Sequence, residues 1–324
     1  TQNTAYEIRL SLVGSEMCIR DRSINTLRIG TRESELALWQ AQQVKDSLET
    51  KSISPQLIPI KSDGDINLTK PIYSMGIKGV FTKALDIALL ENRIDIAVHS
   101  LKDVPTQLPQ GLILGAVIQR GSARDVLVYN EKPNLNAPAT IATGSLRRKA
   151  QWLNQYPNHT LENLRGNVHT RMDKLKNADW QGAIFAKAGL SRVALLGSQF
   201  QELKWMIPAP GQGAIGIVCR SNQLTVINKI KPLHDEATGV CVNIEREFLR
   251  LLEGGCTAPI GAFAQVHGSA ILFEAGLFSL DGKEAITINH QGRISEANYM
   301  ANKAVKEVLS QGGDRLMEII KEEL

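Results

Sequence analysis

The sequence contains few residues of the kinds that mark unusual architectures. Only four cysteines, Cys18, Cys219, Cys241 and Cys256, are spread through 324 residues, and they form no CxxC pair. Their scarcity excludes a dense disulfide framework and a structural zinc site, and it favours a reducing, cytoplasmic setting. Long apolar runs are absent too, since the longest candidates, such as 112–118, have the length of a strand and not the roughly 20 residues that span a bilayer. We therefore expect a soluble protein without membrane contacts.

Signatures for nucleotides, metals and nucleic acids are also missing. No GxxxxGK(S/T) P-loop occurs, and the Gly211-Gln212-Gly213 segment alone is too weak to predict dinucleotide binding. The 37 Lys and Arg exceed the 33 Asp and Glu by a net charge of +4, which is too small a surplus for a protein that coats nucleic acid. Apart from His99, the histidines are His159, His169, His234, His267 and His290, and no metal-binding triad is visible among them. We expect no metal site.

Residues 1–25 are set apart from the rest of the chain. They lack the apolar core and the cleavage site of a signal peptide, and they show no sustained helical period. The string SLVGSEMCIRDR also resembles a translated sequencing adapter. We interpret 1–25 as a non-native or disordered leader, the alternative being a poorly ordered natural extension, and Cys18 is left out of the fold prediction with it.

From residue 27 onward, short apolar runs alternate with helical periods, as expected of an α/β fold. A strand at 27–30 precedes a helix that begins after Ser34, and the same order recurs from the strand at 140–142 to the strand at 183–186. Such alternation predicts mostly parallel sheets covered on both faces, in two units with a cleft between them. Three strand-like stretches and two helical stretches from 259 onward predict a separate small α+β domain.

Basic side chains follow several of the predicted strands. Ligands of open α/β sheets bind at the carboxyl ends of the strands, and the Gly144-Ser145 turn adds the positive end of a helix that begins with Arg147 and Arg148. A single arginine is more often a solvated surface cation, but as a set these residues favour a polyanionic ligand. The basic residues at such positions are Arg28, Arg32, Lys78, Lys102, Arg147, Arg148, Arg165, Arg171 and Arg192.

Three further residues allow two interpretations each. Asp103 could stabilise a developing cation, or it could pair with Lys102 or cap a turn. His99 could be catalytic, although a hydrogen-bonded, partly buried histidine is favoured. Cys256, in a Gly-Gly turn after a helix, is accessible for covalent chemistry, although an isolated cysteine is more often inert. Cys219 and Cys241 lie in apolar runs and are assigned to the core.

Seven motifs together resemble the porphobilinogen deaminases, also called hydroxymethylbilane synthases. They occur in the order of that family and cover the chain from residue 27. The motifs are LRIGTRESELALWQ (27–40), GIKGVF (76–81), ENRIDIAVHSLKDVPTQLPQGL (91–112), TGSLRRKAQ (143–151), LRGNVHTRMDKL (164–175), PAPGQGAIGIVCR (208–220) and LEGGCTAPIGAF (252–263).

This resemblance implies two domains of the type II periplasmic-binding-protein kind and a small α+β C-terminal domain. It places domain 1 at 26–118 with 213–232, domain 2 at 119–212 and domain 3 at 233–324. It also implies a transferase of tetrapyrrole and haem biosynthesis that acts as a cytoplasmic monomer. Four porphobilinogen molecules lose ammonia and are joined head to tail onto a covalent dipyrromethane primer, and hydrolysis then releases hydroxymethylbilane.

The resemblance also implies roles for individual residues. Asp103 matches the catalytic aspartate, whose charge would stabilise the cation left by ammonia, and Cys256 matches the cysteine that carries dipyrromethane through a thioether. Ser74 stands where the family often has a second lysine, and Gly144-Ser145 stands where it has a Ser-Ser pair. The residues matching substrate- and cofactor-binding positions are Arg28, Arg32, Ser34, Lys78, Ser100, Lys102, Thr143, Ser145, Arg147, Arg148, Arg165, Asn167, Arg171, Arg192 and Gln212.

A non-catalytic binding module, in which two lobes close on an anionic ligand, is the alternative from another class. The accessible Cys256 in its Gly-Gly turn weighs against it.

Overall fold

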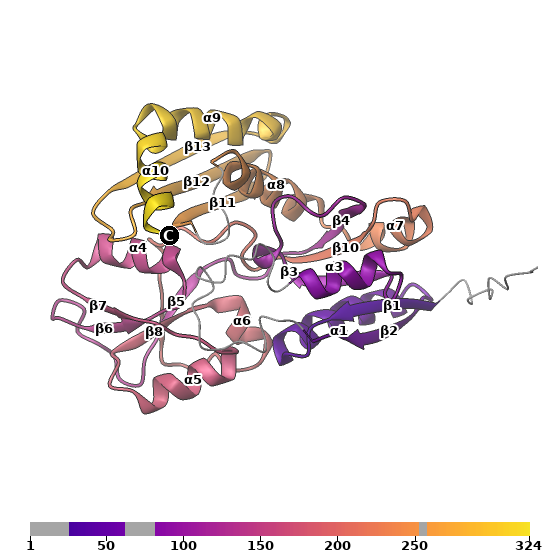
Figure 1. The fold of residues 1–324 in the computed structure, drawn as a ribbon, viewed down its shortest axis with the longest axis horizontal. Coiled ribbons are helices and arrows are strands. Elements are labelled where there is room, and N and C mark those ends of the chain that lie inside the picture. Colours follow the sequence, from indigo (N-terminus) through magenta and orange to yellow (C-terminus); the bar gives the residue numbers. More distant parts are fainter. Residues whose placement is uncertain (1–25, 62–81, 253–257) are drawn as a thin grey trace, which may run out of the picture.

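The computed structural model describes residues 26–61, 82–252 and 258–324. They form three sheets with helices packed on them, and the C-terminal sheet lies above the two others in the view of Figure 1. No helix of these residues is long and apolar enough to cross a membrane.

The first lobe contains a sheet of order β2-β1-β3-β10-β4. Its elements are β1 (Thr26–Thr31), α1 (Glu35–Glu49), β2 (Ser54–Pro59), α3 (Lys83–Leu90), β3 (Ile96–Ser100), the short 3-10 helix η2 (Leu101–Asp103), β4 (Leu112–Ile118), β10 (Ile215–Arg220), α7 (Leu224–Ile230) and the 3-10 helix η3 (Lys231–Leu233).

The second lobe contains a sheet of order β7-β6-β8-β5-β9. Its elements are β5 (Asp125–Val128), β6 (Thr140–Ala142), α4 (Leu146–Gln155), β7 (Thr160–Glu162), α5 (Val168–Asn177), β8 (Gly182–Ala186), α6 (Lys187–Arg192) and β9 (Phe200–Glu202).

The C-terminal domain contains a sheet of order β11-β12-β13. Its elements are α8 (Glu236–Leu251), β11 (Ile260–His267), β12 (Ala270–Phe278), β13 (Ala285–Arg293), the 3-10 helix η4 (Ile294–Glu296), α9 (Ala297–Ser310) and α10 (Gly313–Glu323).

The two lobes share one topology, which confirms the predicted fold class and the predicted mostly parallel sheets. In each five-stranded sheet four strands run in one direction, and the remaining strand, β10 or β5, runs antiparallel to both of its neighbours. Each of these strands follows a segment in which the chain crosses from one lobe to the other, so it enters its sheet from the opposite direction. The domain boundaries given above remain a prediction, and the strands of each sheet fall inside them.

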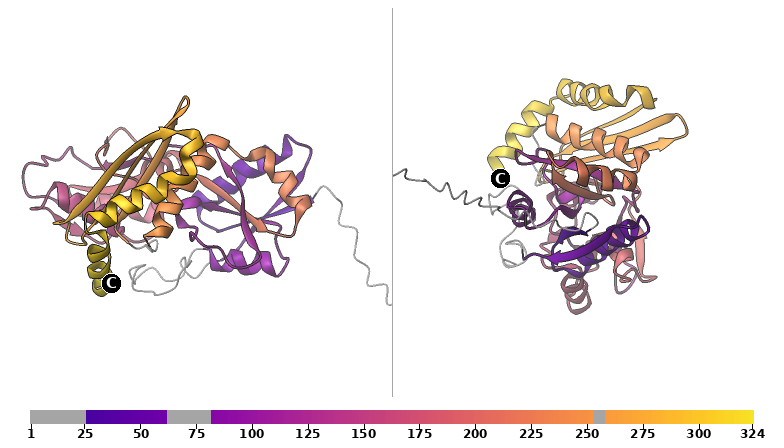
Figure 2. Two further views of the ribbon diagram at one scale, coloured as in Figure 1. Left: turned by 90° about the horizontal axis from the view of Figure 1, so that it is seen from above. Right: turned by 90° about the vertical axis from the view of Figure 1, so that its right-hand side faces the viewer.

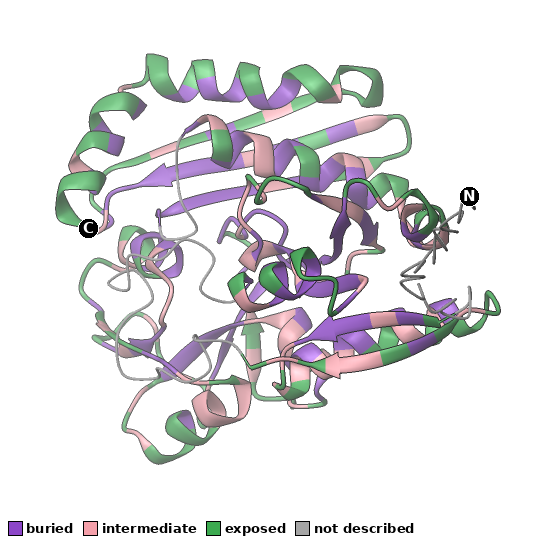
Figure 3. Cartoon of the chain, turned by 45° about the vertical axis from the view of Figure 1, so that its right-hand side comes forward, coloured by how far each residue is buried: buried purple, intermediate pink, exposed green. Residues whose placement is uncertain are grey.

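Both faces of each lobe's sheet are covered by helices, because strands buried on both sides need apolar partners on both sides. In the first lobe, Val44 of α1 and Ile230 of α7 pack on one face, whereas Leu85 of α3 and Val242 of α8 pack on the other. The helices in Figure 3 accordingly show purple buried stripes toward the sheets and green exposed residues outward.

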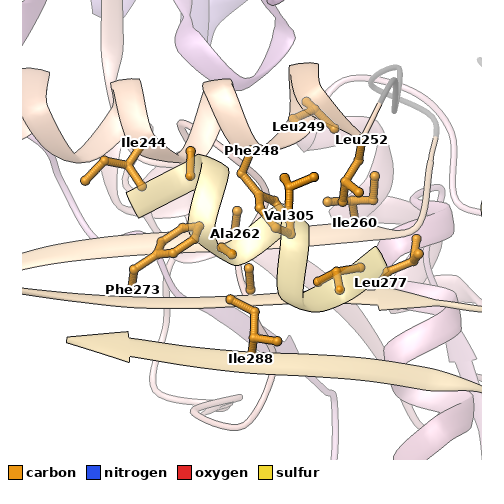
Figure 4. Close-up of a cluster of buried hydrophobic side chains, with 14 of the residues drawn as sticks. Ile244, Phe248, Leu249, Leu252, Ile260, Ala262, Phe273, Leu277, Ile288 and Val305 are labelled. Carbon is orange, nitrogen blue, oxygen red and sulfur yellow. The ribbon is translucent and has the colours of Figure 1, made fainter. Parts of the chain in front are cut away.

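The C-terminal domain has a core of its own. Phe248 of α8 and Phe273 of β12 are buried and meet edge to face with ring centroids 5.6 Å apart. Figure 4 shows these rings among aliphatic side chains from the sheet and the helices above it, such as Ile288 and Val305. Because α8 also supplies Val242 to the first lobe, this helix joins the C-terminal domain to that lobe.

The crossing segments between the lobes are tied together at one buried ion pair. Arg120 Nη1 and Nη2 donate to the two carboxylate oxygens of Glu245 at 2.6 and 3.0 Å, and Glu245 is fully buried. Gly213, with φ +85°, lies where a Cβ would come within 2.6 Å of the carbonyl oxygen of Ser122, so only glycine fits this crossing. Removing one partner of such a buried pair costs about 3–5 kcal/mol, so the pair fixes how the lobes and the C-terminal domain meet.

Candidate active site

Three of the predicted binding residues cap helices at the carboxyl edges of the sheets. Ser34 accepts from the backbone N–H of Ala37 at 3.4 Å, Ser145 from that of Arg148 at 3.5 Å and Asn167 from that of Thr170 at 2.9 Å. The capped helices α1, α4 and α5 follow β1, β6 and β7 directly. Their positive dipole ends therefore lie where an anionic ligand would enter.

Asp103 lies in the turn that follows β3, at the carboxyl edge of the first lobe. Its turn is held by buried Leu101 and Val104, and the Leu101 N–H donates to the carbonyl oxygen of Ala214 at 3.0 Å. No hydrogen bond or ion pair joins the Asp103 carboxylate to another of the described residues, so neither the turn-cap nor the Lys102 ion-pair interpretation is realised. The carboxylate lines a cavity of about 60 Å³ together with Arg32, Ser34, Gln40, His99 and Ser100.

This cavity, at about 60 Å³, has room for water molecules but not for a large ligand. It can therefore form only the floor of a site for a larger ligand. At its wall, Gln40 Nε2 donates to the Ser100 hydroxyl at 2.8 Å, which holds a predicted binding residue in place. Gln40 is 2% exposed and was not among the predicted residues.

Cations from both lobes surround Asp103. Burial and the charge of Arg148 lower the pKa of Lys102 to about 8, which Asp103 opposes. Burial, Arg148 and Arg165 lower the pKa of Arg171 to about 10, again opposed by Asp103 and reinforced by Arg32. Asp103 thus interacts electrostatically with Lys102 of its own lobe and with Arg171 of the other. Arg32, Arg148 and Arg165 act in turn on these two cations.

Arg147 and Arg148 pair with a carboxylate of the protein itself, and their contact with ligand carboxylates stays a prediction. Both are buried, and both pair with Asp125: Arg147 Nη2 lies 2.9 Å from Oδ2 and Arg148 Nη2 2.7 Å from Oδ1. Burial alone would raise the pKa of Asp125, but the two arginines and a hydrogen bond from Gln212 hold it below its usual value. In this structure the two arginines thus contact a protein carboxylate, and Arg148 adds positive charge to the site through space.

Gln212 and Thr143 are buried, whereas Arg192 is half-buried between the lobes. Gln212 Nε2 bridges the carbonyl oxygen of Ala123 and Asp125 Oδ1 at 2.6 and 2.9 Å. The hydroxyl of Thr143 accepts from the Ser145 N–H at 3.3 Å. Arg192 Nη2 donates to the carbonyl oxygen of Gly213 at 2.6 Å and stacks over Trp39 of the first lobe, so it joins the lobes.

Arg28 is not part of this group, and its predicted place at the carboxyl end of β1 is wrong. Its guanidinium binds Asp95 at 2.7 and 3.1 Å and Asn92 at 2.7 and 3.0 Å, before the start of β3. Because β1 and β3 are parallel, these partners mark the amino edge of the sheet. Arg28 therefore holds the turn before β3 at the edge opposite Asp103.

His99 is buried but incompletely hydrogen-bonded. Its Nε2 has no hydrogen-bond partner among the described residues. Burial together with the charge of Arg32 lowers the pKa of His99 to about 4, so the ring is neutral at physiological pH. The expectation of a hydrogen-bonded core histidine is thus corrected at this atom. His99 contributes a neutral wall to the cavity beside Asp103.

Cys256, Lys78 and Ser74 lie outside the described residues. Cys219 and Cys241 are free and buried, and burial raises the pKa of each thiol to about 11, which confirms their assignment to the core.

A larger hollow of about 460 Å³, lined by Tyr129, Lys132 and Phe200, contains none of the predicted site residues. Among the described residues no cluster of His, Cys, Asp and Glu could hold a metal.

The gathered cations suit a ligand with several carboxylates. The Nε atoms of Arg165 and Arg147 are buried and have no hydrogen-bond partner in the part of the chain that the structure describes. Unpaired buried donors are costly unless a ligand or water accepts from them. Sequence reasoning missed Asp125. The feature that could have revealed it is a single acidic residue at the start of an otherwise apolar strand, DVLV. Sequence reasoning also missed Gln40 and Glu245, which helical periodicity places on apolar faces where a polar side chain needs a partner.

Comparison with known proteins gives the same family for two parts of the chain. Residues 27–228 match the family model described as "Porphobilinogen deaminase, dipyromethane cofactor binding domain", and residues 240–310 match "Porphobilinogen deaminase, C-terminal domain".

Curated relatives match over nearly their full length. Porphobilinogen deaminase of Desulforamulus reducens is 37% identical over 91% of this chain and 98% of the relative. Porphobilinogen deaminase of Syntrophotalea carbinolica is 39% identical over 91% of this chain and 96% of the relative. Among solved structures, an ancestral cationic amino acid solute binding protein covers 69% of this chain and 94% of its own at 11% identity and a TM-score of 0.39.

Proposed function

The chain belongs to the porphobilinogen deaminase family of transferases in tetrapyrrole biosynthesis, and from this premise we propose how its residues divide the work. Asp103 is the catalytic carboxylate, and Cys256 carries the dipyrromethane cofactor. The observation that carries this proposal is the Asp103 carboxylate, which has no hydrogen-bond partner among the described residues and borders a cavity beside Arg32. It also interacts electrostatically with Lys102 of its own lobe and with Arg171 of the other. The binding-module alternative is wrong, because both halves of the chain match an enzyme family.

The residues present fit the cofactor. Each of its pyrroles brings an acetate and a propionate, and the unpaired Nε atoms of Arg165 and Arg147 leave donors for such groups. When bound, the cofactor supplies the free pyrrole carbon to which the substrate is joined. We assign the carboxylates of cofactor and substrate to Arg32, Lys102, Arg165 and Arg171, with the capped helix ends of α1, α4 and α5 adding partial positive charge.

Asp103 then acts on the substrate. As ammonia leaves porphobilinogen, positive charge develops on the pyrrole, and its N–H becomes a stronger hydrogen-bond donor. A fixed carboxylate that accepts from this N–H stabilises the charge without reorganising at the moment of reaction. The neutral ring of His99 adds no competing charge beside Asp103. Ser100, Thr143 and Gln212 serve by holding the walls of this site.

We also infer that the protein is a cytoplasmic monomer without nucleic-acid or membrane partners. The cations and Asp103 all come from one chain, so the site needs no second copy for completion. The free thiols of Cys219 and Cys241, and the thiol that Cys256 must offer, suit a reducing compartment.

Mass spectrometry tests the proposal directly. We expect the intact purified protein to exceed its sequence mass by one dipyrromethane and a tryptic peptide containing Cys256 to carry this excess. Denatured protein should also react with a pyrrole-specific colour reagent. Active enzyme with the unmodified sequence mass would contradict the assignment of Cys256.

The low pKa of Lys102 predicts a pH dependence. Above about pH 8 the folded protein loses the proton of Lys102, so one cation for substrate carboxylates disappears. We therefore expect kcat/KM to fall as pH rises through about 8, since this ratio reports groups of the free enzyme. The variant Lys102→Arg keeps its charge and should hold kcat/KM to higher pH; identical profiles for both proteins would refute the role of Lys102.

A further inference from the structure

The turn that carries Asp103 is bound by a helix of the C-terminal domain. Arg246 of α8 donates from Nη1 to the carbonyl oxygen of Val104 at 2.8 Å and from Nη2 to that of Pro105 at 2.7 Å. Val242, one helical turn earlier, is fully buried in the same apolar cluster as Leu101 and Val104. One face of α8 thus contacts both the backbone and the core side of this turn.

The neighbouring residue Glu245 holds the other backbone segment beside Asp103. It accepts from the N–H of Gly211 at 2.7 Å, and Gly211 lies so close to the turn that a Cβ there would be 3.3 Å from the backbone nitrogen of Lys102. Two consecutive residues of α8 therefore fix the segments on either side of the catalytic turn. Figure 1 shows α8 between the C-terminal sheet and β4 and β10 of the first lobe, and Figure 2 gives further views.

We propose that Arg246 is a positioning residue for the reaction: through Val104 and Pro105 it sets the place of Asp103 relative to α8, the helix that ends shortly before Cys256. This inference rests on the proposed role of Asp103. A guanidinium suits the task because its planar fork reaches two carbonyl oxygens at once and keeps its charge at every working pH.

The test compares Arg246→Ala and Arg246→Lys with Arg250→Ala. Arg250 lies one turn further along α8, is exposed and pairs with Glu247 on the surface, so it controls for charge loss on the same helix. Rates are expressed per molecule that carries the cofactor by intact mass. For Arg246→Ala we expect kcat to fall about ten- to a hundredfold with little change in KM, as for a displacement of about 1 Å at a reacting group. Arg246→Lys, which still donates, should recover most of the loss.

Hydrogen exchange provides a readout apart from activity. The amides of Leu101 and Val104 donate to Ala214 and Leu101, so Arg246→Ala should speed exchange in the peptide containing 101–104 and leave the exchange of α1 unchanged. If Arg246→Ala does not accumulate as folded protein, Arg246→Gln is measured in its place. Wild-type exchange and wild-type kcat in either variant would overturn the proposal.

A double variant separates this inference from the role of Asp103. If Arg246 acts through Asp103, then Asp103→Asn with Arg246→Ala should be no slower than Asp103→Asn alone. Losses that multiply would mean that Arg246 acts elsewhere, and the positioning proposal fails. If Asp103→Asn by itself keeps the wild-type kcat, the proposed catalytic role fails instead.

Discussion

Asp103→Asn is expected to lower kcat by about a hundred- to a thousandfold, the usual effect of losing one preorganised electrostatic group. KM should change little, because the carboxylate stabilises charge that exists only as ammonia leaves. The fold should be retained, since buried Leu101 and Val104 hold the turn and the Asp103 carboxylate has no hydrogen-bond partner among the described residues. Steady-state kinetics with porphobilinogen, together with thermal unfolding, measures both expectations.

The matched control for this variant is Asp46→Asn. Asp46 lies on the exposed side of α1, where its carboxylate accepts only from Gln42 of the same helix in the described hydrogen bonds. The Asp46→Asn variant also loses one negative charge, but at a site far from the cleft. Its kcat should therefore equal that of the wild type. Near-wild-type kcat in Asp103→Asn would show that another carboxylate stabilises the cation.

Cys256→Ser is expected to abolish both the extra mass and the activity. A serine hydroxyl is a much weaker nucleophile than a thiolate and forms no thioether, so no primer would be retained. Intact mass and the rate of hydroxymethylbilane formation are the measurements. The substitution changes only one sulfur to oxygen, so the variant should fold normally. Its unfolding temperature is compared with that of wild-type protein without the cofactor.

Cys241→Ala provides the control for loss of a thiol. The Cys241 side chain is buried in the core of the C-terminal domain, and burial together with Glu245 raises its pKa to about 11, so it remains an unreactive thiol. This variant should keep the mass excess and the activity. Retention of the excess in Cys256→Ser, or its loss in Cys241→Ala, would place the attachment elsewhere.

The sequence by itself determined the local structure of this protein. The period of apolar residues predicted the helix after Ser34 and the strand at 140–142, and the structure has them as α1 and β6. These features depend on neighbours a few residues apart, so a sequence displays them directly. The motifs also sufficed to identify the family, since they preserve whole segments in order.

Only the tertiary structure decided which distant residues meet. It paired Asp125 with Arg147 and Arg148, placed Arg28 at the amino edge with Asp95, and brought Arg246 of the C-terminal domain to the turn of Asp103. The physical reason is that a charged side chain in a sequence shows its need for a partner but not the partner's identity. That choice depends on strand order, on the antiparallel entry of β5 and β10, and on the packing of α8 against the first lobe.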